Sequence, residues 1–227
     1  MRGLGRYLAG RGVTAACPLL AGHGTSPYDL HTTTWRDWHA SVSNALDEML
    51  AHCDQVYVVG ISLGGALALY TAAQRAQDVA GVVAISTPIY LPKGLGVALK
   101  GLNHSVPFLN KPYRDIQDPI AREQHVGYKM ASVAALASLI ELLGQVRTSL
   151  RQVQMPTLVV YARHDHVVPS FSAHYIYSRL GTPDKSLLVL HRGYHIATVD
   201  YDKEKVYEAV GEFVGVRSQE SGRRVRA

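Results

Sequence analysis

A serine, an aspartate and a histidine, each just after a strand-like segment, are the residues in this sequence best suited to chemistry. Ser62 stands in the pentapeptide GISLG at 60–64, after a β-branched segment at 55–60 and before an Ala- and Leu-rich segment at 64–75. A G-x-S-x-G turn between a strand and a helix exposes its serine at the helix N-terminus, where backbone N–H groups stabilise a developing oxyanion. The pattern predicts a nucleophile at Ser62 and an oxyanion donor in the backbone N–H of Leu63.

The two partners that a serine nucleophile needs are found later in the chain. A hydroxyl attacks efficiently only when a base takes its proton, and the base is oriented by an acid. With this type of turn, the order along the chain is serine, acid, histidine. Asp165 follows the apolar segment 156–162 and is the predicted acid, while His195 follows the segment 186–190 and is the predicted base.

Other histidines compete for the role of base. His191 lies nearer to the end of the segment 186–190 and is the main rival of His195. His164 and His166 lie too close to Asp165 in sequence to be its partner. No grouping of His, Cys and Asp has the spacing of metal ligands, so we expect no metal ion and no cofactor.

Composition and charge exclude several classes of function. The chain has 227 residues, of which 47% are hydrophobic and 18% charged, and these values indicate one folded domain. Of the net charge of +5, the tail from residue 216 carries a large part. This tail lacks interleaved aromatic residues and the body lacks a basic stripe, so we expect no nucleic-acid partner. No apolar run approaches the ~20 residues that span a bilayer, so we expect no stable membrane insertion.

The N-terminus and the cysteines bear on the compartment. Arg11 interrupts the first apolar stretch, which is then shorter than the core of an export signal. Two cysteines, Cys17 and Cys53, do not make a disulfide framework. We therefore predict a cytoplasmic protein, and the sequence leaves its oligomeric state open.

The body of the chain alternates between strand-like and helix-like segments. Apolar, β-branched runs separated by helical runs are typical of a parallel sheet with helices on both faces. We therefore predict an α/β fold with a mostly parallel sheet flanked by helices. The predicted strands are 13–20, 55–60, 79–86, 156–162 and 186–190. The predicted helices are a short one through Leu4, Tyr7 and Leu8 that ends near Gly10 and Gly12, and those at 35–50, 64–75, 172–180 and 203–214.

One long stretch breaks this alternation. Between 87 and 154 no segment is a convincing strand, the first half is punctuated by prolines, and the second half around 126–146 is helical. An insertion of this size predicts either a small helical cap over the open end of the sheet or a helical subdomain with packing duties only. The predicted division is a core of 1–87 and 155–215, a helical cap of 88–154 and a flexible basic tail of 216–227.

The motifs together resemble those of a known family. GISLGG at 60–65, ARHDHVVP at 162–169 and GYHIATVDYDKEKV at 193–206 look like motifs of the small bacterial carboxylesterases and monoacylglycerol lipases of the α/β-hydrolase superfamily. PLLAGHGTSPYDL at 18–30 and TTTWRDW at 32–38 resemble them too. The resemblance implies the nucleophile at Ser62, the acid at Asp165 and the base at His195. His23 lies in a loop that is usually structural in this family.

The start of the chain departs from the family pattern. These enzymes begin with a central strand and a His-Gly-Phe-like loop that supplies a second oxyanion N–H, whereas this chain begins in the helix that would follow. Losing one oxyanion donor costs ~10²–10³ in rate. Two explanations stay open: Met1 lies downstream of the true start, which we favour, or the shorter protein is weak, unstable or inactive.

From these observations we expect a serine hydrolase that cleaves carboxylic esters through an acyl-enzyme. The resemblance implies a small-molecule partner, either a short or medium acyl ester or a monoacylglycerol. A thioester or activated amide is an alternative substrate for the same three residues. A non-catalytic, hydrolase-like binding protein is the third possibility, because the oxyanion loop is missing.

Overall fold

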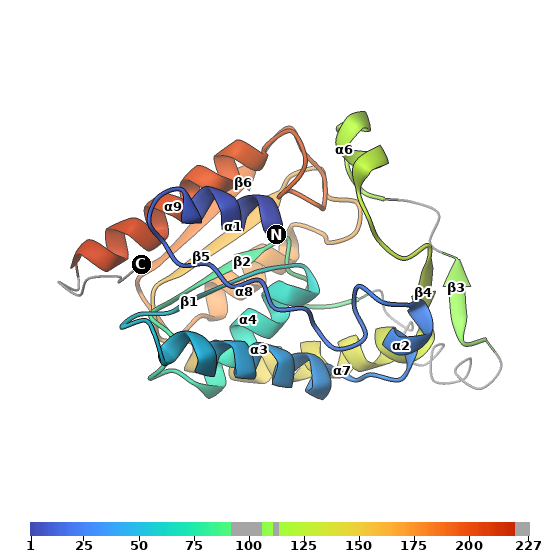
Figure 1. Ribbon diagram of the computed structural model, residues 1–227, viewed down its shortest axis with the longest axis horizontal. Helices are drawn as coiled ribbons and strands as arrows, with labels where there is room; N and C mark the ends of the chain where they lie inside the picture. The colour runs from blue at the N-terminus through green and yellow to red at the C-terminus, as the bar shows by residue number, and fades with distance from the viewer. Residues whose placement is uncertain (92–105, 111–113, 221–227) are drawn as a thin grey trace.

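The centre of the computed structural model, which describes residues 1–91, 106–110 and 114–220, is a four-stranded parallel sheet (Figure 1). Its strands lie in the order β1 (Tyr57–Ile61), β2 (Gly81–Ile85), β5 (Thr157–Ala162) and β6 (Lys185–Leu190). All neighbouring pairs run parallel. The strands predicted within 55–60, 79–86, 156–162 and 186–190 are thus confirmed. Because the strands are parallel, their carboxyl ends meet at one edge of the sheet.

Helices cover both faces of this sheet (Figure 1). Two buried clusters of apolar side chains lie between the sheet and the helices, one on each face. Every residue of β2 is buried, as expected for a strand that is covered on both sides. The fold is therefore the predicted α/β fold. One face packs on α3 (Trp35–Leu50), α4 (Leu63–Gln74), α7 (Val133–Ser149) and α8 (Phe171–Arg179), and the other on α1 (Arg2–Ala9) and α9 (Lys203–Glu220).

Two helices on the first face form for different local reasons. α3 begins at a capping box, in which the backbone N–H of Thr34 donates to the Asp37 carboxylate at 2.8 Å. These bonds hold the pKa of Asp37 below its ordinary value. α4 carries no charged residue and is buried along most of its length, so the hydrophobic effect fixes it within the core. α4 directly follows Ser62, so the core also anchors the start of that helix.

The stretch 87–154 contains strands that the sequence did not indicate. β3 (Phe108–Asn110) pairs with β4 (Met130–Ser132) in a short antiparallel ladder, which corrects our expectation that no strand lies here. The pair forms between segments far apart in sequence, and three-residue runs are too short to show a period of two. A short helix, α6 (Pro119–Gln124), lies between the two strands. The division of the chain into core and cap stays a prediction.

Helix was predicted around 126–146, but it begins only at Val133, after β4, and this helix, α7, packs into the main core. α7 places Leu142, Leu143 and Val146 in the same buried cluster as α4, and the 3₁₀ turn Leu150–Gln152 continues it. Val133–Gln152 is the one described segment long and apolar enough to cross a membrane, which corrects our expectation that no apolar run approaches this length. Since 44% of it is buried inside the protein, and core helices meet the same criteria, this is weak evidence for a membrane span.

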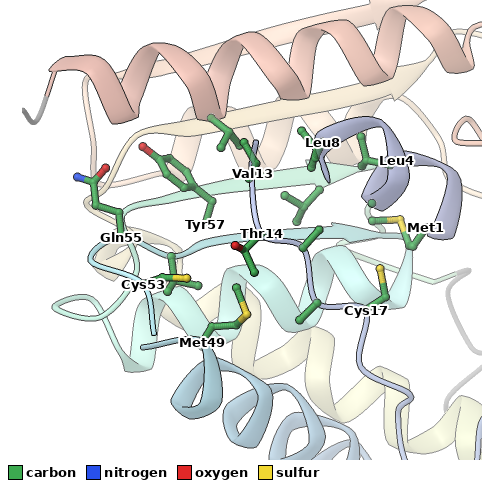
Figure 2. Close-up of a pocket in the computed structure, with 16 residues that line it drawn as sticks. Met1, Leu4, Leu8, Val13, Thr14, Cys17, Met49, Cys53, Gln55 and Tyr57 are labelled. Carbon is green, nitrogen blue, oxygen red and sulfur yellow. The ribbon is translucent and has the colours of Figure 1, made fainter. Parts of the chain in front are cut away.

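The predicted strand 13–20 is wrong. These residues form no ladder, and most of them are exposed. A strand needs backbone partners, and the nearest candidate, β1, is separated from the segment by two adjoining cavities of about 130 and 360 Å³. Figure 2 shows Val13, Thr14 and Cys17 on one side of the smaller cavity and Tyr57 of β1 on another.

This cavity lies along the unpaired edge of the sheet. β1 is an edge strand, because only β2 pairs with it among the described residues. An edge strand presents backbone N–H and C=O groups on its open side.

The C-terminal helix extends past the predicted boundary of the body. α9 ends at Glu220, whereas we expected a flexible tail from residue 216. Residues 221–227, which hold the rest of the predicted tail, lie outside the described residues.

Candidate active site

Ser62 lies in the sharp turn between β1 and α4. Its backbone has φ 54° and ψ −118°, a conformation that a residue with a side chain rarely adopts, and it is the N-cap of α4. Strain of this kind persists only where surrounding structure enforces it, and it is concentrated at functional sites. The side chain is half-buried, so its hydroxyl remains accessible at the carboxyl edge of the sheet.

Two of the three glycines around Ser62 are required by close packing. A Cβ on Gly60 would collide with the backbone of Gly64 and Gly65. A Cβ on Gly65 would collide with the hydroxyl of Thr87, which follows β2. By contrast, a Cβ on Gly64 would meet nothing within 4 Å. The motif therefore allows a strand, a helix and a neighbouring strand end to converge beneath the serine.

Asp165 lies in the turn after β5, and every oxygen of its carboxylate is bonded. Oδ1 accepts the backbone N–H groups of Val167 and Val168, at 2.8 and 2.7 Å. Oδ2 lies 2.8 Å from Nδ1 of His195. The side chain is only 2% exposed. This geometry fixes the carboxylate in one orientation, with one oxygen reserved for the histidine.

His195 lies between Asp165 and Ser62. Its Nε2 is 3.0 Å from the Ser62 hydroxyl oxygen, while its Nδ1 faces Asp165. A proton on Nδ1 that is donated to the carboxylate leaves Nε2 as an acceptor for the serine hydroxyl. The imidazole is 7% exposed, so water competes little for either bond. The tertiary structure thus brings together three side chains that are far apart in sequence.

The backbone N–H of Leu63 occupies the first position of α4. The first N–H groups of a helix have no acceptor within the helix, and they lie at the positive end of its dipole. The N–H groups of Gly65 and Ala66 already bond to the carbonyl of Ser62. The Leu63 N–H is adjacent to the nucleophile, and its role as an oxyanion donor stays a prediction.

The competing histidines lie away from these bonds. His191 is exposed, and within the described part of the chain the hydrogen bonds of Ser62 and Asp165 go to His195 instead. His164 is exposed as well. His166 bonds to a different carboxylate, that of Asp115, at 2.7 Å. His23 bonds to the carbonyl of Ala21 and contacts Trp38 edge-on, which are structural contacts.

A set of buried carboxylates around the histidine loop escaped prediction from the sequence. Asp115 accepts hydrogen bonds from the backbone of His166 and His195. Asp200 and Asp202 accept backbone N–H groups within 192–194. Asp200 and Asp202 fall within the family-like motif at 193–206 but received no role there, and no motif marked Asp115, which acts on loops that are distant in sequence. In the described part of the chain, no group of His, Cys, Asp and Glu has a geometry that would hold a metal ion.

Comparison with known proteins identifies the relatives of this chain. The family model described as "Serine aminopeptidase, S33" matches residues 1–202. A thermostable monoacylglycerol lipase of Bacillus sp. (strain H-257) is 32% identical over 94% of this chain and 84% of its own length. A carboxylesterase of Bacillus subtilis (strain 168) is 30% identical over 94% of this chain and 86% of its own length.

The solved structures agree with these sequence relatives. A structure reported for the metagenome-derived lipolytic enzymes LipS and LipT superimposes with a TM-score of 0.90 and 32% identity, covering 95% of this chain and 87% of that one. The fold, the family match and the relatives therefore lead to one assignment. The chain belongs to the serine aminopeptidase S33 family and is an α/β-hydrolase of the bacterial carboxylesterase and monoacylglycerol lipase group.

Proposed function

We propose that this protein hydrolyses carboxylic esters through an acyl-enzyme formed on Ser62, with His195 as the base and Asp165 as the acid that orients it. The observation that carries the proposal is the continuous chain of two hydrogen bonds, 3.0 Å from Ser62 to His195 and 2.8 Å from His195 to Asp165. Relatives named as a carboxylesterase and a monoacylglycerol lipase favour esters as substrates.

In the first half of the reaction, the Ser62 hydroxyl oxygen attacks the ester carbonyl carbon. Nε2 of His195 takes the hydroxyl proton as the new C–O bond forms. The imidazolium that results is stabilised by the Asp165 carboxylate, which itself stays ionised. The imidazolium then donates its proton to the departing alkoxide, which leaves as an alcohol, and the acyl group remains on Ser62.

In the second half, water enters and repeats the sequence. Nε2 of His195 takes a proton from the water, whose oxygen attacks the acyl carbon. The tetrahedral intermediate collapses, the acid leaves, and the proton returns to the Ser62 oxygen. Both halves place negative charge on the former carbonyl oxygen. The Leu63 N–H, at the positive end of α4, would donate to that oxygen.

For the substrate, we propose esters with short or medium acyl chains or monoacylglycerols. Support comes from the names of the two sequence relatives and from the apolar side chains beside the site. Leu20, Leu63 and Leu67 line the larger cavity next to Gly60 and Gly64. A thioester or an activated amide would undergo the same steps, and the family description includes an aminopeptidase, so both belong in a substrate test.

The decisive experiment combines a substrate panel with a nucleophile variant. A p-nitrophenyl ester series, a monoacylglycerol, an acyl thioester and an aminoacyl anilide are assayed with the wild-type protein, with Ser62→Ala and with Ser178→Ala. Ser178 lies on the exposed face of α8, away from the site, and is the matched control. We expect Ser62→Ala to lose about 10⁴-fold or more in ester turnover, while Ser178→Ala is unchanged.

A fluorophosphonate probe separates a poor substrate choice from a non-catalytic protein. We expect covalent labelling of the wild type at Ser62 and none of Ser62→Ala. Folded wild-type protein that neither reacts with the probe nor turns over any member of the panel would contradict the proposal. That result would favour a hydrolase-like scaffold that binds without catalysis.

A further inference from the structure

We propose that Asp115 is a positioning residue that holds the loops of His195 and Asp165 in register, so that the imidazole stays between the serine and the acid. This inference rests on the proposed ester hydrolysis. Asp115 belongs to the segment just before α6, outside both of the loops that carry the triad residues. Its side chain is 1% exposed, which is unusual for a carboxylate.

The Asp115 carboxylate bonds to both loops at once. Oδ2 accepts the backbone N–H of His166 at 2.9 Å and the backbone N–H of His195 at 3.2 Å. Oδ1 lies 2.7 Å from Nδ1 of His166. His166 is the residue directly after Asp165, so one carboxylate joins the neighbour of the acid to the base itself.

The backbone of the same segment reinforces this link. The carbonyl of Asp115 accepts the N–H of Ile196 at 3.2 Å. Two residues further on, the backbone N–H groups of Gln117 and Asp118 donate to Asp200, which is fully buried within the histidine loop. The segment 115–118 is therefore bonded at both ends to the loop that carries His195.

The buried carboxylate of Asp115 keeps the two loops together only while it accepts hydrogen bonds from both of them. Hydrogen bonds to a charged acceptor are stronger than neutral ones, and removing the acceptor leaves buried N–H groups unpaired. Without the Asp115 carboxylate, the backbone N–H groups of His166 and His195 would lose their shared acceptor, and the two loops would be free to move apart. Since a displacement of about 1 Å at a reacting group costs roughly 10²-fold in rate, we expect this movement of the loops to lower kcat.

The test compares Asp115→Ala and Asp115→Asn with the control Asp118→Ala. Asp118 lies in the same segment, but within the described ranges its side chain bonds only to Ile120 and Ala121, where it caps α6. All variants are compared with the wild type for kcat and KM on a p-nitrophenyl ester, for the rate of fluorophosphonate labelling and for the melting temperature.

We expect Asp115→Ala to lower kcat and the labelling rate by roughly 10–100-fold, with KM within a few-fold of wild type. Asp115→Asn should recover most of this loss, because its amide oxygen can accept the two backbone N–H groups and its NH₂ can donate to His166. Asp118→Ala should lower the melting temperature without lowering kcat. An Asp115→Ala enzyme with wild-type kcat per folded molecule would overturn the proposal.

A spectroscopic measurement covers the case in which Asp115→Ala does not fold. The Nδ1 proton of His195, shared with Asp165, should give a low-field proton signal in the wild type, and this signal requires no turnover. We expect this signal to be kept in Asp115→Asn and in Asp118→Ala, and to shift or broaden in Asp115→Ser, whose shorter side chain cannot bond to both loops at once. An unchanged signal in Asp115→Ser would overturn the role of Asp115. A wild type with this signal but no turnover or labelling would instead contradict the proposed function.

Discussion

The backbone N–H of Ser62 donates a hydrogen bond of 2.8 Å to the carbonyl of Ile85, the last residue of the neighbouring strand β2. This bond extends the β1–β2 ladder by one step into the turn, so the strained residue is fixed by the sheet as well as by α4. The glycines around it make this close approach of backbones possible. The position of the serine oxygen is therefore set by the core of the protein.

The glycine turn predicts a contrast between two neighbouring substitutions. Gly60→Ala places a methyl group against the backbone of Gly64 and Gly65, which cannot move without disturbing α4. We expect a loss of about 1–3 kcal/mol in the free energy of unfolding, as for other overpacked sites. Gly64→Ala is the control, because its methyl group meets nothing within 4 Å, and its stability should equal or exceed wild type. Chemical denaturation measures both, and equal stabilities would contradict this view of the turn.

Asp165→Asn should disturb the orientation of His195 without much effect on substrate binding. An amide oxygen would keep the bonds from Val167 and Val168, which turns the NH₂ group toward Nδ1 of His195. The imidazole proton is then forced onto Nε2, where it can no longer accept the serine proton. We expect kcat to fall by about 10³–10⁴-fold with a smaller change in KM. Asp54→Asn, at an exposed position, is the control, and steady-state kinetics on one ester are sufficient.

The assignment of the base is tested by a pair of histidine variants. His195→Gln removes the only imidazole that bonds to Ser62 among the described residues, and we expect turnover to fall by several orders of magnitude. His191→Gln changes an exposed side chain four positions earlier and should leave kcat/KM within about twofold of wild type. Comparable losses in the two variants would show that the wrong histidine has been chosen.

The stability of the protein should depend on pH through His39. Burial, and to a lesser extent the nearby Arg75, lower the pKa of His39. The unfolded chain therefore takes up a proton first as the pH falls below about 6.5, the ordinary value for histidine. Stability contributed by neutral His39 is complete above that pH and declines as the pH drops toward the lowered folded-state pKa.

A variant without this imidazole isolates the effect. We expect the free energy of unfolding of His39→Gln to fall less than that of wild type between about pH 7.5 and about pH 5.5, two values on either side of the ordinary histidine pKa. His52→Gln, an exposed histidine at the end of α3, is the control. If wild type and His39→Gln lose the same stability over this range, His39 does not contribute to the pH dependence.

Sequence patterns were sufficient where the controlling interactions are local. The strands β1, β2, β5 and β6 were predicted from apolar, β-branched runs, and the helix at 35–50 was predicted as well. The motif around Ser62 was recognisable because a strand, a turn and a helix are contiguous there. The same logic placed Asp165 and His195 at strand ends, which a parallel sheet gathers at one edge.

What only the tertiary structure decided depends on partners that are remote in sequence. The segment 13–20 has the composition of a strand but forms none, because a ladder needs a neighbour and a cavity separates this segment from β1. The pairing of β3 with β4, and the choice of His195 over His191, follow from contacts across the fold. Asp115 shows the limit most clearly, because a lone aspartate before a short helix has no pattern, and its importance arises only when folding brings two distant loops to its carboxylate.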